Sequence, residues 1–127
     1  MSAAVCLRLS AMLGFLAVAL GAFGAHSLNP LLVHNQTLSI WEKAVFYHFI
    51  HTVMMFVLAT RRPFIAGPWY WFLAGVVIFS GSLYLLAITN QRWLGAVTPV
   101  GGLSFLAGWL WLALARPKEP TDTPPAT

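Results

Sequence analysis

Two histidines, His48 and His51, are the residues best suited to chemistry, because they stand three positions apart in an otherwise apolar stretch. On a helix this spacing places both imidazoles on one face. Ionisable groups within such a stretch usually face the interior of a helix bundle. The pair could bind a metal, relay protons or contact a polar ligand. Alternatively, each ring is neutral and hydrogen-bonded to a neighbouring helix, with Ser80, Ser82 and Tyr84 as candidate partners.

A metal centre is not predicted, since two histidine nitrogens fall short of the three or four protein ligands that zinc needs. His26 could be a third ligand and His34 a fourth, but no pattern in the sequence brings them together. We expect no cofactor, because the sequence has neither an H-E-x-x-H motif nor a glycine-rich phosphate loop.

Acidic residues limit the enzymatic mechanisms further. The chain has three of them, Glu42, Glu119 and Asp122, and the last two lie in the C-terminal tail. A pair of carboxylates for acid–base catalysis therefore cannot form among the apolar stretches, and a Ser-His-Asp triad would lack its buried aspartate. We expect a protein that is not an enzyme. Glu42 is predicted to form a capping box with Ser39, in which each side chain bonds the other's backbone amide at a helix start.

The elements that must position these residues are four long apolar runs. Hydrophobic residues make up 59% of the 127 and charged residues only 8%, where a soluble domain has about 25% charged. A domain of this length cannot bury so much apolar surface, so a lipid bilayer is the expected partner. We predict an all-α, four-helix transmembrane bundle of up-down topology within residues 1–116. Its spans are about 5–25, 39–60, 69–89 and 97–115, with a short interfacial helix starting at Asn29-Pro30 and a disordered cytoplasmic tail at 117–127.

Lysine and arginine predict the orientation. Five of the seven fall on one side of a four-span arrangement, namely Arg8, Arg61, Arg62, Arg116 and Lys118, and two fall on the other, namely Lys43 and Arg92. The positive-inside rule then places both termini in the cytoplasm.

A cleaved signal peptide is the alternative for the first run, which is long for that role. The basic residues form no stripe, so nucleic acid is not an expected partner.

Tryptophans and small residues predict how the helices sit and pack. The tryptophans stand near the span ends, as in the aromatic belts at the two membrane interfaces; they are Trp41, Trp69, Trp71, Trp93, Trp109 and Trp111. Helices in lipid associate through small residues that allow close backbone approach. The predicted packing positions are Gly14, Ala17, Gly21, Ala25, Gly81, Gly101 and Gly108. They favour a compact bundle over a self-association surface or a ligand-lined cleft.

Several motifs together resemble a family of small membrane proteins typified by the bacterial protein YgdD, which includes the eukaryotic transmembrane protein 256. The motifs are Gly21-Ala22-Phe23-Gly24-Ala25-His26-Ser27-Leu28, Trp41-x-x-Ala44, Tyr47-His48-x-x-His51, Phe79-Ser80-Gly81-Ser82-Leu83-Tyr84, Arg92-Trp93-Leu94-Gly95, Thr98-Pro99-x-Gly101-Gly102 and Gly108-Trp109. Ser27 stands where the family more often has glycine. The resemblance implies a four-span protein of the bacterial plasma membrane. It implies no activity, because the family is of unknown function.

The motif residues indicate where a polar or ligand site is expected. They are His26, Trp41, His48, His51, Tyr84, Arg92 and Trp93. Arg92 is interpreted as a solvated loop charge, a lipid-headgroup anchor or a partner for Glu42. The predicted role is structural, accessory, or the binding of a lipid, a membrane protein or a second copy of the chain. The alternative is a small transporter or proton-conducting protein that uses His48 and His51.

Overall fold

The computed structural model describes residues 1–116, and every regular element within them is helical. The first two long helices are α1 (Ala3–Ala25) and α3 (Leu38–Thr60), with the short α2 (Asn29–His34) between them. The third span, Ala66–Thr89, comprises α4 (Ala66–Gly75), the π-helical turn η1 (Val76–Ser80) and α5 (Gly81–Thr89). The fourth combines the 3₁₀-helix η2 (Arg92–Ala96) with α6 (Thr98–Leu114). The predicted tail at 117–127 lies outside the described residues.

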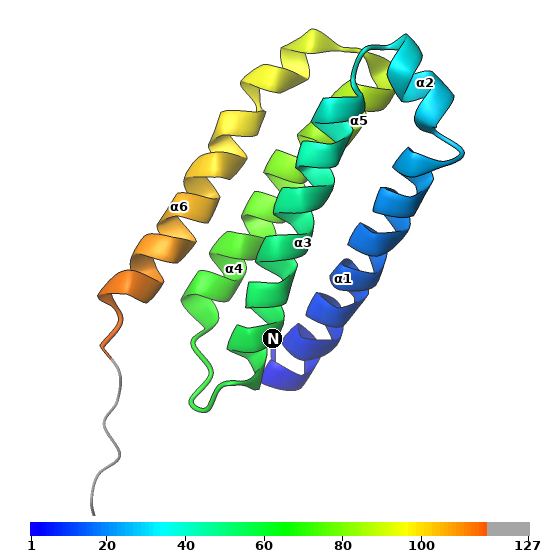
Figure 1. The fold of residues 1–127 in the computed structure, drawn as a ribbon. Coiled ribbons are helices and arrows are strands. Elements are labelled where there is room, and N and C mark those ends of the chain that lie inside the picture. Colours follow the sequence, from blue (N-terminus) through cyan, green and yellow to red (C-terminus); the bar gives the residue numbers. More distant parts are fainter. Residues whose placement is uncertain (117–127) are drawn as a thin grey trace, which may run out of the picture.

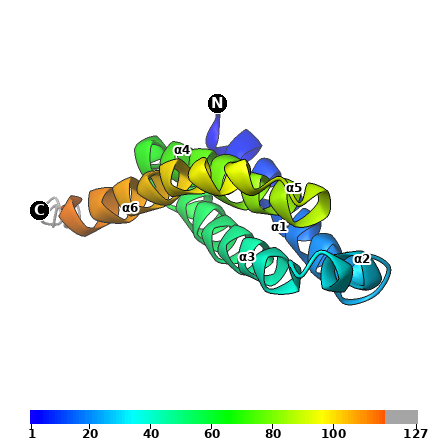
Figure 2. The ribbon, with the colours of Figure 1, turned by 90° about the horizontal axis from the view of Figure 1, so that it is seen from above.

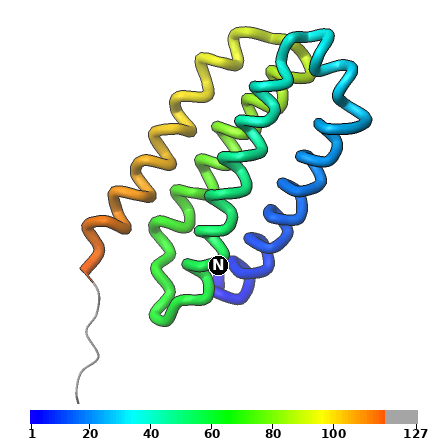
Figure 3. The backbone as a smooth tube through the Cα atoms, in the orientation of Figure 1, coloured from blue at the N-terminus to red at the C-terminus, as the bar shows by residue number. Residues whose placement is uncertain are grey.

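Four helices are long and apolar enough to cross a membrane. They alternate in direction, so the start of α1 and the end of α6 lie at the same end of the bundle (Figure 1, Figure 3). The predicted all-α bundle with four apolar spans is confirmed. Large apolar side chains also cover its outer surface; Phe15 is 72% exposed and Leu114 is 73% exposed. Such a surface is suited to contact with lipid.

The helices form an open row, with α3 and the α4–α5 span in the middle. α3 packs against α1 on one side and against α4, η1 and α5 on the other, whereas α6 packs mainly against α4 and η1. Helices α1 and α6 are therefore the two flanks of the row (Figure 1), and Figure 2 shows the same helices from above, with α6 alongside α4. Each flanking helix packs mainly against one neighbour, and single side chains reach the next helix, as Trp69 does to Ser10 of α1 and Trp109 of α6 does to His51.

Helix α3 begins without the predicted capping box. The helix starts at Leu38 with Thr37 at the N-cap position, and no side chain caps it. Ser39 thus lies inside the first turn and is exposed. The Thr37 hydroxyl instead donates to the Ala87 carbonyl of α5 at 2.7 Å. This bond is favoured because a buried hydroxyl without a partner would lose the free energy of its hydration. The capping prediction was wrong, and Glu42 has no part in starting the helix.

Glycines set the closest helix contacts. A Cβ atom added to Gly101 would lie 2.3 Å from the Phe79 backbone nitrogen, and one added to Gly108 would lie 2.6 Å from the Phe72 ring. Such distances leave no room for a side chain, so α6 can lie against the third span only with glycine at these positions.

The small residues of α1 face α3 in a looser fit. Ala17 is fully buried, whereas Cβ atoms at Gly21 and Gly14 would lie 3.3 Å from Val45 and 3.6 Å from Thr52. Two of the predicted packing positions are not packed closely against another helix. Ala25 is exposed, and a Cβ at Gly81 would meet nothing within 4 Å. In α1 the close contact falls one residue earlier, at Gly24, where the indole of Trp41 occupies the space.

The aromatic belt accounts for only some of the tryptophans. Trp71, Trp93 and Trp111 are exposed, as a belt requires. Trp41 and Trp69 are buried instead, because each indole N–H bonds a neighbouring helix. Trp41 Nε1 donates to the Leu20 carbonyl at 2.9 Å, and Trp69 Nε1 donates to Ser10 Oγ at 3.0 Å.

Candidate functional site

His48 lies at the centre of a polar cluster that joins α3 to α5. Its Nδ1 atom is 3.0 Å from the Tyr84 hydroxyl. The Tyr84 ring packs edge-on against Trp41, with 4.8 Å between ring centroids. The fold therefore brings together three of the predicted site residues, Trp41, His48 and Tyr84. Tyr84 is one of the hydrogen-bond partners that we predicted for the histidines.

The other nitrogen of His48 has no partner. Nε2 is buried and makes no hydrogen bond, and the ring lies beside the backbone of Leu13 on α1. One turn further along α3, Thr52 Oγ1 is also buried without a hydrogen bond. Within residues 1–116 these are the two buried side-chain polar atoms in this condition. Each leaves about 1–3 kcal/mol of desolvation uncompensated, so His48 presents a buried ring nitrogen toward α1 without a hydrogen bond in the described residues.

His51 is fully engaged. Its Nδ1 is 2.7 Å from the Tyr47 carbonyl, which requires Nδ1 to carry the proton. Nε2 then accepts a hydrogen bond from the indole N–H of Trp109 at 3.1 Å. The ring also stacks on Phe105 with 3.6 Å between centroids. His51 is therefore a neutral link between α3 and α6, and it has no free nitrogen for a ligand.

The remaining predicted site residues lie apart from this cluster. His26, Arg92 and Trp93 are exposed. Arg92 makes no ion pair with Glu42 in the part of the chain that the structure describes. The histidines do not converge either; residues 1–116 contain no group of three His, Cys, Asp or Glu side chains that could hold a metal ion.

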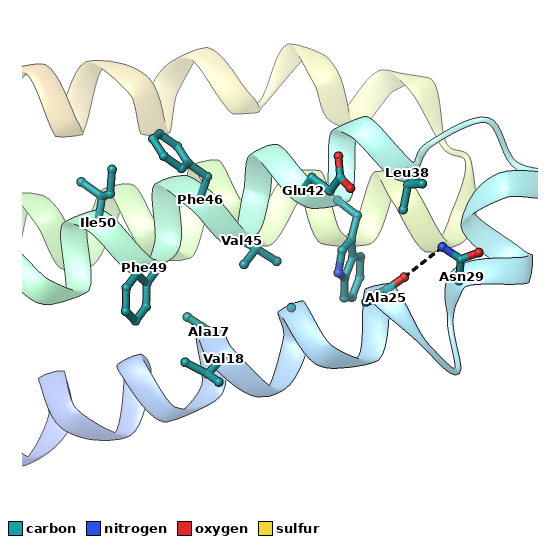
Figure 4. Close-up of a pocket in the computed structure, with 13 residues that line it drawn as sticks. Ala17, Val18, Ala25, Asn29, Leu38, Glu42, Val45, Phe46, Phe49 and Ile50 are labelled. Carbon is teal, nitrogen blue, oxygen red and sulfur yellow. Dashed lines mark hydrogen bonds between the residues drawn. The ribbon is translucent and has the colours of Figure 1, made fainter.

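A large groove runs between α1 and α3, a feature that the sequence analysis did not locate. Its volume is about 630 Å³, and its walls are almost entirely apolar (Figure 4). Small residues of α1 face larger side chains of α3 across it. The α1 wall comprises Ala17, Val18, Gly21, Gly24 and Ala25, and the α3 wall comprises Leu38, Trp41, Val45, Phe46, Phe49 and Ile50. Two polar residues, Asn29 and Glu42, also line it. The small-residue stripe of α1 was the available signal, but it had been interpreted as a packing seam.

Comparison with known proteins decides the family. Residues 20–102 match the family described as "Protein of unknown function (DUF423)". The chain belongs to this family. The UPF0382 membrane protein YwdK of Bacillus subtilis (strain 168) is 40% identical over 121 residues, which is 90% of this chain and 97% of that protein. The UPF0382 inner membrane protein YgdD of Escherichia coli (strain K12) is 44% identical over 114 residues, 86% of each chain.

The resemblance noted from the motifs is thereby confirmed. This DUF423 chain is a membrane protein of unknown biochemical activity, like its relatives. The matched residues extend from the end of α1 to the start of α6 and include His48, His51, Tyr84 and most of the groove. No solved structure matches the chain.

Proposed function

We propose that this protein is a non-enzymatic lipid-binding protein of the membrane, and that the α1–α3 groove holds an acyl chain. The groove carries the proposal, because it combines about 630 Å³ of space with apolar walls between the flanking helix α1 and its neighbour α3. An acyl chain is the apolar molecule that surrounds such a surface in a bilayer. The single acidic residue within 1–116, Glu42, is too few for paired-carboxylate catalysis.

We propose further that the protein lies in the bacterial plasma membrane with both termini in the cytoplasm. Four exposed arginines support this orientation: Arg8 near the start of α1, Arg61 and Arg62 after α3, and Arg116 after α6. The alternation of the helices puts all four at one end of the bundle. Basic residues concentrate on the cytoplasmic side of membrane proteins.

Native mass spectrometry of the full chain in nanodiscs of defined lipids tests the groove. Ala25 lines the groove and is exposed, so Ala25→Phe fills the space without a clash in the core. Met12→Phe is the matched control, because Met12 is an exposed α1 residue outside the groove. We expect wild type and Met12→Phe to retain one lipid and Ala25→Phe to lose it about tenfold. Equal retention in all three would refute the proposal, as would a second copy of the chain in place of the lipid.

The unpartnered side of His48 favours a second candidate function, proton conduction past His48 and Thr52. His51 would not take part, since both of its nitrogens are bonded. If the protein conducts protons, reconstituted vesicles with an internal pH dye should show a flux that His48→Gln abolishes. A wild-type flux no greater than that of empty vesicles, or an equal flux in His48→Gln, would exclude this role.

A further inference from the structure

Glu42 stands at the groove without any structural role in the described chain. It is the one acidic residue among residues 1–116, and it is exposed. The predicted capping role is absent, because α3 starts at Leu38. The structure records no hydrogen bond or ion pair for its carboxylate within those residues. An exposed carboxylate beside apolar walls, with no partner among the described residues, is available to a cationic group from outside the chain.

The groove has a polar end and an apolar end, as a lipid molecule does. Glu42 and Asn29 lie toward the α2 end of the groove, whereas Phe49 and Ile50 lie further along α3 (Figure 4). From Glu42 to Ile50 the helix rises about 12 Å at 1.5 Å per residue. The groove is therefore polar at the end nearer the membrane surface and apolar toward the bilayer interior. An amphiphile lying along it would place its headgroup at Glu42.

We infer that the groove selects membrane lipids whose headgroup carries a primary ammonium, with Glu42 as the recognition residue. This inference rests on the proposed lipid-binding function. A primary ammonium has three N–H donors and a positive charge for the carboxylate. A trimethylated ammonium has the same charge and no N–H donor, and an anionic headgroup would be repelled. Lys43 is adjacent in sequence but does not line the groove, so the groove itself presents a negative group alone.

The test compares three lipids with identical acyl chains in nanodiscs: phosphatidylethanolamine, phosphatidylcholine and phosphatidylglycerol. Native mass spectrometry gives the occupancy of each on the full chain. We expect phosphatidylethanolamine to be preferred over phosphatidylcholine by about threefold to fivefold, the range of a partly exposed charge pair. Glu42→Gln should bring this ratio to about one, and Glu42→Asp should keep most of it.

The variants separate the two proposals. If Ala25→Phe lowers the occupancy of every lipid while Glu42→Gln leaves the ratio unchanged, the groove binds lipid and the ammonium inference is wrong. If wild type shows no preference for phosphatidylethanolamine, the inference is equally wrong. If Ala25→Phe changes nothing, the groove is not the lipid site, and both proposals fail.

Discussion

At the scale of single residues, two buried threonines differ in their hydrogen bonding: Thr37 at the start of α3 and Thr52 within that helix. Thr37 Oγ1 donates to the Ala87 carbonyl at 2.7 Å, and Thr52 Oγ1 has no partner among residues 1–116. Valine replaces the hydroxyl with a methyl group of similar size. Thr37→Val should therefore destabilise the protein by about 1 kcal/mol. Thr52→Val should leave it unchanged or stabilise it by a similar amount, because an uncompensated polar atom is removed.

Thermal unfolding of both variants in one detergent measures the difference. The expected order of melting temperature is Thr52→Val at or above wild type, and Thr37→Val below it. A loss in Thr52→Val as large as that in Thr37→Val would show that the Thr52 hydroxyl has a partner in the protein as purified. That partner would also lie close to the unpaired nitrogen of His48, which is one helical turn away.

The histidines show how far residue-scale prediction reached. Their spacing predicted a shared face, and Tyr84 was among the expected hydrogen-bond partners. The structure supplies that bond for His48 but directs His51 to Trp109 on α6. The sequence could not predict this, because position alone had assigned Trp109 to the interfacial belt. Which helix a side chain meets depends on helix packing, and no local pattern records it.

At the scale of elements, the junction of α6 with η1 depends on a single glycine. A Cβ at Gly101 would lie 2.3 Å from the Phe79 backbone nitrogen, and backbone cannot move aside as a flexible side chain can. Gly101→Ala should therefore cost about 3 kcal/mol or prevent assembly. Gly81 in the neighbouring helix has open space around its Cβ position. Gly81→Ala should be neutral or stabilise the protein by up to about 1 kcal/mol, the difference in helix propensity.

Folded yield and melting temperature in detergent test this pair. Because both substitutions add one methyl group to a helical glycine, a difference between them reports the contact and not the propensity. Equal stability of the two variants would mean that α6 does not approach η1 this closely.

The apolar runs predicted that four helices exist, and composition was sufficient for that. The packing register and the irregular turns of these helices could not be predicted from composition. The i, i+4 stripe assigned Ala25 to the α1 seam, whereas Gly24 is the residue that meets Trp41. The π-helical turn at Val76–Ser80 was not foreseen. One added residue in a turn changes no hydropathy pattern, and it rotates every later side chain of that span relative to its neighbours.

At the scale of the whole molecule, the open row of helices explains why a groove exists. A closed four-helix ring would cover two sides of each helix. Here α1 packs mainly on α3, and the small side chains of α1 leave the space between them unfilled. Composition cannot predict this, since the same small residues would serve a tight seam equally well.

Membrane orientation is the property of the whole molecule that is most open to a direct test. Ser2 and Gln91 are exposed at opposite ends of the bundle, and Cys6 is buried. Intact bacterial cells that express Ser2→Cys or Gln91→Cys are treated with a membrane-impermeant maleimide. We expect Gln91→Cys to react at once and Ser2→Cys to react only after the membrane is permeabilised. Wild type should stay unlabelled as the control, because its one thiol is buried.

The opposite pattern would place the four arginines outside the cell, contrary to the positive-inside rule. It would also invert the proposed lipid site, because Glu42 would then meet headgroups of the cytoplasmic leaflet.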